Sequence, residues 1–311
     1  MQDRQSAAGE AMISVIIPHF NQPDLLARCL AALCPQMAAG HEVEIIVIDN
    51  GSRQLPADVV AGFPGVRLDH EATPGPGLAR NHGVSLSRGA ILAFIDADCV
   101  AAPGWLAEIV RQFANPDAMV LGGDVQILHV DAAHPTAIEC YEAEFGYRME
   151  QYIKYQYFTG TGNLAMRRQG FEQVGGFAGI GLAEDRDWGQ RAHARGIRII
   201  WAPQMLAYHP ARRDFAELTR KWDRHTAHDF EMILARRFGR LRWAAKTVAM
   251  VASPLAHLPR VLTSTRIKGG PWGKFLALAV LVRIRLYRAR LMVPLLFARD
   301  AARLSTRWRK G

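Results

Sequence analysis

Short apolar runs alternate with amphipathic stretches from residue 13 to about residue 128. Residues 13–17, 43–48 and 90–95 are almost continuously apolar, which is typical of parallel strands buried on both faces. Residues 23–37 carry leucines at helical spacing and predict a helix between the first two strands. Further helices are predicted at 78–87 and 105–113, and β segments at 66–68 and 119–128.

Each of the three apolar runs ends in polar side chains. His19 and Asn21 follow the first run, Asp49 ends the second, and Asp96 and Asp98 follow the third. Because burying a carboxylate is costly, these side chains should lie at the carboxyl ends of the strands. Alternate residues of an extended segment point the same way, so Asp96 and Asp98 could both reach one divalent cation. The pattern predicts the ligand-binding edge of a mostly parallel α/β sheet with flanking helices.

The next part of the chain predicts one long aromatic, acidic helix over residues 136–158. It leads into a glycine loop at 159–163, where the backbone could approach a ligand closely, and a short strand at 164–166. An acidic segment opens a helix predicted at 184–195, where carboxylates complement the helix dipole. Two β segments, 198–201 and 205–210, close the domain.

Length and composition bound the class of protein. With 311 residues, half of them hydrophobic, the chain can hold one sizeable α/β domain and an appendage. Its four cysteines show no paired metal spacing and fit reduced thiols. Residues 1–10 are polar and lack the apolar segment of a secretory signal. These features favour a cytoplasmic location.

Charge divides the chain into two parts. Residues 1–235 carry 20 Lys and Arg against 28 Asp and Glu, a net charge of −8, whereas residues 236–311 carry 18 against one acid, a net charge of +17. Basic tails of this kind bind nucleic acid or anionic lipid. We therefore predict a catalytic domain at 12–235 and a basic helical tail at 236–311.

The tail contains an apolar run, residues 275–297, that is interrupted by Arg283, Arg285, Arg288 and Arg290. Four charges in the middle of a membrane span would be very costly. We predict instead an amphipathic helix in the plane of an anionic membrane, with the arginines at lipid phosphates. The protein would then be peripheral on the cytoplasmic face. The alternative is a helical appendage packed on the catalytic domain or on a second subunit.

The sequence lacks the signatures of several enzyme classes. There is no Gly-x-Ser-x-Gly segment or Cys–His context for nucleophilic hydrolysis, no Walker phosphate loop and no dinucleotide-binding Gly-x-Gly-x-x-Gly after the first strand. The polar groups instead suit a diphosphate bound to Mg²⁺ or Mn²⁺. Asp98 and His209 could ligate the ion, and Asp185 could take a proton from an attacking hydroxyl.

Short motifs occur at 14–21, 46–52, 77–83, 94–98, 159–163 and 184–185, and together they cover roughly residues 13–215. In their order, these motifs resemble those of the family 2 glycosyltransferases, which have the GT-A nucleotide-sugar fold. The ordered set is far more specific than any single run. The resemblance implies an inverting transfer of a sugar from a nucleotide-sugar donor to a hydroxyl by direct displacement. The acceptor would be a glycan, a polysaccharide or a lipid-linked sugar.

The resemblance also implies roles for individual residues. It assigns the catalytic base to Asp185, with Glu184 as a competing candidate. The metal ligands would be Asp98 and His209, with Asp96 in the metal shell or at the ribose. Asn50 departs from the family pattern, because many relatives have a second Asp there. The residues implied in nucleotide-sugar binding are Pro18, His19, Asn21, Asp49, Arg80, Asp96, Gly160, Thr161 and Gly162.

Several alternatives stay open at this point. Arg80 could be a solvated helix cation and His209 an ordinary edge residue. Asp187 also competes for the base role, but it points to a different face of its helix from Asp185. Nucleotidyl transfer would normally need a basic loop after the first strand, which residues 18–22 do not offer. A catalytically silent scaffold that binds RNA or lipid is a third possibility, although no nucleic-acid partner is expected.

Overall fold

The computed structural model of the protein describes residues 12–180 and 183–298. These form two compact units: residues up to 126 together with 148–210, and residues 127–147 together with those from 211 onward. This division differs from the boundary predicted at residue 235, because residues 127–147 and the helix after 211 pack with the C-terminal helices. The polar segment 1–10 and the end of the basic tail, 299–311, lie outside the described residues.

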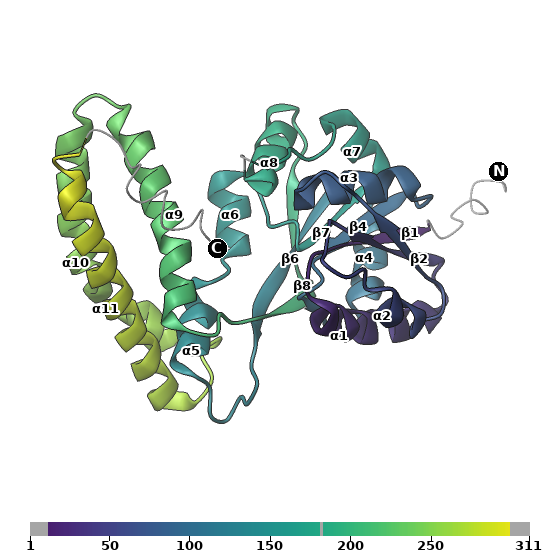
Figure 1. Ribbon diagram of the computed structural model, residues 1–311, viewed down its shortest axis with the longest axis horizontal. Coiled ribbons are helices and arrows are strands. Elements are labelled where there is room, and N and C mark those ends of the chain that lie inside the picture. The colour runs from purple at the N-terminus through teal and green to yellow at the C-terminus, as the bar shows by residue number, and fades with distance from the viewer. Residues whose placement is uncertain (1–11, 181–182, 299–311) are drawn as a thin grey trace, which may run out of the picture. The chain divides into compact units, whose positions relative to one another are not determined.

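An eight-stranded sheet forms the centre of the first unit, in the order β3-β2-β1-β4-β7-β6-β8-β5 (Figure 1). β3, β2, β1 and β4 pair in parallel, whereas β7 is antiparallel to β4 and β6, and β5 is antiparallel to β8. The predicted α/β fold is confirmed. The strands are β1 (Ile13–His19), β2 (Val43–Asp49), β3 (Val66–His70), β4 (Ile91–Ile95), β5 (Val100–Ala101), β6 (Val120–Leu128), β7 (Asn163–Arg167) and β8 (Ile199–Pro210).

Helices cover both faces of this sheet. α1 and α4 pack on one face, and α3, α7 and α8 pack on the other around Trp188 (Figure 1). Along β1, Val15 and Ile17 join the first cluster and Ile16 the second, which is why the strand is apolar at each of these positions. The helices of this unit are α1 (Pro23–Leu33), a 3₁₀ turn (Cys34–Ala39), α2 (Ala57–Ala61), α3 (Pro76–Leu86), α4 (Trp105–Phe113), α6 (Met149–Gln156), α7 (Arg168–Val174) and α8 (Glu184–Ala194).

The order in which successive strands are added to the sheet reverses at β1. β2 and β3 lie on one side of β1, and β4 lies on the other. In parallel α/β sheets such a point leaves a crevice at the carboxyl ends of the strands, where ligands bind. His19 ends β1, Asp49 ends β2, and Asp96 follows β4 directly, so three of the predicted site residues lie at this edge.

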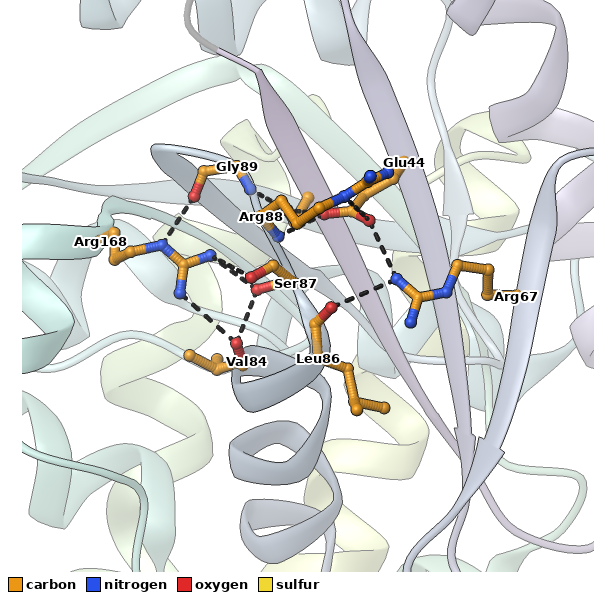
Figure 2. A network of polar contacts seen from close by, with 9 residues as sticks. Glu44, Arg67, Val84, Leu86, Ser87, Arg88, Gly89 and Arg168 are labelled. Carbon is orange, nitrogen blue, oxygen red and sulfur yellow. Dashed lines mark hydrogen bonds and ion pairs between the residues drawn. The ribbon is translucent and has the colours of Figure 1, made fainter.

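A polar network holds the opposite, amino-terminal ends of the strands (Figure 2). Buried Glu44 of β2 accepts hydrogen bonds from Ser14 Oγ at 2.7 Å and from the backbone N–H of Arg88 at 2.6 Å. Arg67 Nη1 lies 3.2 Å from the other carboxylate oxygen of Glu44. Arg168 donates to one carbonyl in the last turns of α3 and to two in the α3–β4 turn. Burial opposes ionisation of Glu44, but these contacts hold its pKa below the ordinary value.

We expect Glu44→Gln to lower the free energy of unfolding by about 2 kcal/mol, because it weakens buried hydrogen bonds to a charged acceptor. A lowered native pKa makes this contribution complete above the unfolded-state value of about 4.3, and the contribution is lost as the pH falls through the native pKa. In denaturant unfolding, the free energies of unfolding of variant and wild type should therefore differ at neutral pH and converge in acid. Glu172→Gln, at an exposed position of α7, is the matched control. Equal effects of the two substitutions would contradict the prediction.

Helices make up most of the second unit. The side chain of Thr136 caps α5 in a reciprocal capping box with Glu139, and Asp214 caps α9 by accepting from the backbone N–H of Glu217. Two apolar clusters hold the helices together, one around Tyr141 and Ile284, the other around Phe230, Trp243 and Met292. Its described helices are α5 (Ala137–Phe145), α9 (Phe215–Leu234), α10 (Gly239–Thr263) and α11 (Gly270–Leu295).

The helix predicted over residues 136–158 is in fact two helices, α5 and α6, in different units. Gly146, a poor helix former, follows the last residue of α5. α5 buries Cys140 and Tyr141 in the helical unit, whereas α6 contacts β8 of the first unit. The two β segments predicted at 198–201 and 205–210 are one continuous strand, β8.

The arginines of α11 make contacts inside the second unit. Arg288 is 4% exposed, lies 4.2 Å from the ring centre of Trp222 and has Nη2 at 3.3 Å from Asp229 Oδ2. Burial and the neighbouring Arg285 lower the pKa of Arg288 to about 10. Arg283 lies 3.9 Å from the centre of an aromatic ring of α9. The expectation that all four arginines lie at lipid phosphates is therefore wrong for Arg288. Within its own unit α11 packs against α5, α9 and α10. None of the described helices is long and apolar enough to cross a membrane.

Candidate active site

A hydrogen-bonded cluster around Asp49 joins the carboxyl ends of β1 and β2. Asp49 is fully buried; its Oδ1 lies 2.9 Å from His19 Nδ1, and its Oδ2 accepts from the backbone N–H of Ser52 at 3.0 Å. His19 Nε2 accepts from the backbone N–H of Gln22, so Nδ1 carries the proton that faces Asp49. Burial opposes ionisation of Asp49, but the hydrogen bonds from Ser52 and His19 hold its pKa below the ordinary value. Pro18 precedes this cluster in β1.

Asn21 and Asn50 fix the loops that leave these strands. Asn21 adopts the left-handed conformation with φ 54°, its backbone N–H donates to Ser52 Oγ, and its side chain accepts from the backbone N–H of Arg53. The side chain of Asn50 donates to two carbonyls of the β3–α3 connection and accepts from Gly75 N at 2.7 Å. An Asp at position 50 could not donate, so this departure from the family pattern has a structural role that the sequence prediction missed.

Arg80 of α3 is buried and bridges two carboxylates. Its Nη2 lies 2.5 Å from Asp96 Oδ1, and its Nη1 lies 3.1 Å from Glu184 Oε1. α3 lies directly against β1, because a Cβ added at Gly83 would lie 2.5 Å from the side chain of Ile16. The alternative of a solvated Arg80 is therefore wrong. Arg80 instead links the end of β4 to the first turn of α8.

The glycine loop passes close to Asp96. A Cβ added at Gly162 would lie 2.5 Å from Asp96 Oδ2, which only glycine avoids without a shift. Thr161 is buried, and Gly160 accepts from the backbone N–H of Asn163 at 3.3 Å to close the turn. The structure thus brings the predicted loop residues together with the carboxylate that follows β4.

Asn163, the last residue of the glycine loop, fixes the loop to three other elements. The sequence prediction gave it no individual role. Its side chain is buried, accepts from Trp105 Nε1 at 2.8 Å and donates to the carbonyls of Asp124 and Met205 at 2.7 Å each. A signal was present, because an Asn between a glycine loop and a strand needs partners for all its polar atoms once buried. Its three partners lie on α4, β6 and β8, far apart in the sequence, so no local pattern could identify them.

We expect Gly162→Ala to lower kcat/KM by about 10²-fold, because the added methyl group must displace Asp96 or the loop. Gly170→Ala is the control, since a Cβ there would meet nothing nearer than 3.5 Å. Steady-state kinetics of both variants, with circular dichroism to verify folding, would test this. Comparable activity of the two variants would show that the close contact has no functional consequence.

Asp98 and His209 form a second pair at the same edge of the sheet. β5 and β8 pair with Val100 opposite Tyr208, and this register brings His209 Nε2 to 3.3 Å from Asp98 Oδ2. Burial disfavours both charges, but their contact holds the pKa of Asp98 below and the pKa of His209 above the ordinary value. His209 Nδ1 lies 2.6 Å from the carbonyl oxygen of Pro210. His209 therefore contacts another of the predicted site residues.

The three acids of the first turn of α8 have different partners. Glu184 is paired with Arg80, and Asp187 pairs with Arg191 at 2.8 Å. Asp185 is half-buried and accepts from the backbone N–H of Arg186 at 2.7 Å; no ion pair of Asp185 is found in the described part of the chain. Burial raises the pKa of Asp185, and the neighbouring Glu184 adds to this effect. Of the three, Asp185 is the one not held by a cation.

The chemistry of Asp98 and His209 fits a divalent metal ion. Mg²⁺ is usually held by one or two carboxylates together with substrate phosphates and water, not by an all-protein cage. Among the described residues no group of three or more His, Cys, Asp or Glu side chains is arranged to hold a metal ion. The contact of His209 Nδ1 with Pro210 leaves Nε2 facing Asp98, which is the usual orientation of a histidine ligand. The pair therefore fits an ion that is bound jointly with a diphosphate.

Comparison with known proteins defines the family. The sequence model described as Glycosyl transferase family 2 matches residues 14–175. Glycosyltransferase AglE from Haloferax volcanii is 31% identical over 215 residues, which cover 67% of this chain and 70% of that protein. Validoxylamine A glucosyltransferase from Streptomyces hygroscopicus subsp. limoneus is 28% identical over 221 residues, and the chain spans about half (49%) of its length. The chain belongs to glycosyltransferase family 2 and is a glycosyltransferase.

Solved structures share the GT-A fold. The mannosyltransferase PcManGT from Pyrobaculum calidifontis, in complex with GDP-Man and Mn²⁺, has a TM-score of 0.56 at 19% identity, covering 98% of this chain and 89% of that chain. Glucosyl-3-phosphoglycerate synthase from Mycobacterium tuberculosis, in complex with Mn²⁺, UDP and phosphoglyceric acid, has a TM-score of 0.51 at 19% identity, covering 68% and 74%. At these identities the similarity establishes the fold, and it confirms the predicted fold type.

Proposed function

We propose that this glycosyltransferase moves a sugar from a nucleoside diphosphate to a hydroxyl acceptor with inversion at the sugar carbon. The observation that carries the proposal is the series of contacts from Asp96 through Arg80 to Glu184. These contacts tie the first turn of α8 to the end of β4 and so hold Asp185 near the carboxyl edge of the sheet. A direct displacement needs a base fixed beside the donor in this way.

In the proposed reaction the acceptor oxygen attacks the anomeric carbon while the bond from that carbon to the diphosphate oxygen breaks. The acceptor proton passes to a carboxylate oxygen of Asp185, and the bonding electrons leave with the diphosphate. A raised pKa supports this role, because a more basic carboxylate is a better proton acceptor as long as it is ionised at the working pH. Glu184 acts through its ion pair with Arg80, as a positioning residue.

For the donor we propose the predicted set at the ends of β1, β2 and β4 and in the glycine loop. Support comes from the buried His19–Asp49 pair, which gives the loops of this edge a fixed conformation. Arg80 contributes by orienting Asp96, since both of its terminal nitrogens already contact carboxylates. The proposed donor-binding residues are Pro18, His19, Asn21, Asp49, Arg80, Asp96, Gly160, Thr161 and Gly162.

We propose Mg²⁺ or Mn²⁺ as the cofactor, with Asp98 and His209 as its protein ligands and Asp96 close by. The bound ion would neutralise charge on the departing diphosphate. Two structures of similar fold support this assignment, because the mannosyltransferase complex contains Mn²⁺ with GDP-Man and the synthase complex contains Mn²⁺ with UDP.

For the acceptor we propose a glycan or lipid-linked hydroxyl, in the synthesis of a polysaccharide or glycolipid at the cytoplasmic face of a membrane. Four free cysteines support a reducing compartment, and the basic helices of the second unit support attachment to an anionic surface.

Thermal shift measurements with UDP- and GDP-sugars test the donor and the metal together. A ligand at about 100 times its Kd stabilises the native state by about 2.7 kcal/mol, so the correct nucleotide should raise the melting temperature when Mn²⁺ is present. NMR of the product then reports the anomeric configuration. Absence of any metal-dependent stabilisation, or retention of configuration, would refute the proposal.

A further inference from the structure

The α10–α11 hairpin of the second unit exposes large apolar side chains along both helices. Leu255 is 78% exposed, Val248 72% and Trp272 64%. Scattered exposed apolar residues are ordinary, but a contiguous patch of them marks an interaction surface. We call this set the apolar hairpin face: Leu241, Val248, Val251, Leu255 and Leu262 of α10, and Trp272, Phe275, Val282, Leu286 and Val293 of α11.

Spacing places these side chains on one side of each helix. In α10 four of them lie seven residues apart, from Leu241 to Leu262, which is two turns of an α-helix. In α11 the intervals from Trp272 to Val293 are likewise three, four or seven residues. The opposite sides of both helices carry the buried residues of the unit, such as Trp243 and Ile284. The exposed stripe is therefore a second apolar face, additional to the one that packs in the core.

A groove connects the stripes of the two helices. α10 and α11 lie side by side (Figure 1), and near their connection Leu258 and Leu262 face Phe275 and Leu278 across a hollow of about 470 Å³. Lys274 is at its edge, with Nζ bonded to the carbonyl oxygen of Leu262. Because side chains of both stripes line this one groove, the two helices present a single apolar surface there.

The charge of the hairpin indicates whether a second copy of the chain or a membrane would cover this apolar face. Residues 239–295 contain eleven Lys and Arg and no Asp or Glu. Of these cations, Arg240, Arg242, Lys268, Arg283 and Arg290 are exposed. A second copy of the chain would bring like charges together with no acid on the hairpin to pair with them, which is unfavourable. An anionic bilayer offers both an apolar interior for the face and negative headgroups for the cations.

We propose that the α10–α11 hairpin lies in the plane of an anionic membrane, with the apolar hairpin face inserted below the headgroups. The inference rests on the membrane attachment in the proposed function and is independent of the catalytic roles. In this proposal apolar side chains attach the hairpin to the membrane. The four arginines of α11 cannot all do so, because Arg288 is buried among side chains of α9. Burial of apolar side chains supplies most of the binding, and the exposed cations select for anionic lipid.

Flotation of the full-length protein with phosphatidylcholine vesicles, with and without phosphatidylglycerol, tests this surface. Wild type should float with the anionic vesicles, and most of it should stay bound at high salt. Leu255→Gln and Leu286→Gln should each lower the partition coefficient about tenfold, since each removes one inserted side chain. Val130→Gln, at a 96% exposed position of the same unit outside the hairpin, is the matched control and should bind like wild type.

Three results would overturn the inference. The first is equal binding of wild type and a double variant that combines Leu255→Gln with Leu286→Gln, which would leave membrane attachment standing but not through this face. The second is a wild-type dimer in light scattering that the double variant dissociates, which would identify the face as a contact between copies. Failure of wild type to bind any vesicle would refute membrane attachment as well. Sugar transfer to a water-soluble acceptor would still test the catalytic proposal separately.

Discussion

We expect Asp185→Asn to lower kcat by about 10²- to 10⁴-fold and to leave donor binding intact. The amide keeps the size and polarity of the side chain but cannot accept the acceptor's proton in the transition state. Because the proposed donor-binding residues do not include Asp185, titration calorimetry with the nucleotide and Mn²⁺ should give the same Kd as for wild type. A fall in kcat without a change in Kd is the expected signature of a lost base.

The pH profile gives an independent measure of the same residue. The proposed base must be ionised to accept a proton, so kcat/KM should fall as the pH drops through the pKa of Asp185. Since burial raises that pKa, the acidic limb should lie above the value of about 3.9 for an unperturbed Asp.

Asp187→Asn is the control for Asp185, two residues along the same helix and paired with Arg191. It should retain near-normal turnover. Near-normal turnover of Asp185→Asn, with loss of activity in Glu184→Gln and unchanged folding, would instead move the base to Glu184.

The second large effect is expected at Asp98. Asp98→Asn should remove the Mn²⁺ dependence of nucleotide binding and lower transfer by about 10³-fold or more, because charge stabilisation by a metal amounts to several kcal/mol. The pKa of His209 should also fall towards its ordinary value, since its contact with the Asp98 carboxylate is what raises it. Calorimetry with and without Mn²⁺, and NMR titration of His209, measure these two effects.

Asp58→Asn removes an exposed carboxylate of α2 by the same substitution and serves as the control for Asp98. It should leave binding and turnover unchanged. A folded Asp98→Asn protein that still bound nucleotide in a metal-dependent way would exclude Asp98 as a ligand.

Much of the first unit could be predicted from local sequence patterns. Residues such as Val15 and Ile16 face opposite sides of the sheet and are both buried, so a continuous apolar run identified a strand covered on both faces. Carboxylates that follow such strands must lie at their ends, which identified Asp49, Asp96 and Asp98 as neighbours of one edge. The glycines at 83 and 162 were recognisable only as members of a motif, while the close contacts that require them belong to the fold.

The environment of the arginines in the tail was predicted less well, because it too depends on contacts between distant segments. Hydropathy treats an arginine as a group that must stay in contact with water or phosphate. Trp222 and Asp229 of α9, more than fifty residues earlier in the chain, make burial of Arg288 favourable. No pattern within residues 275–297 contains that information.

By itself, therefore, the sequence determined the strands, their polar ends and the family, because these depend on periodicity and on short ordered motifs. Only the tertiary structure decided which of the acids in α8 lacks a cationic partner. Arg80 pairs with Glu184 from 104 residues away, whereas Asp187 pairs with Arg191 on its own helix. The three carboxylates are almost equivalent in sequence, and what separates Asp185 is the absence of an ion pair among the described residues. The Arg80–Glu184 pair arises from packing between distant segments, so it exists only once the chain has folded.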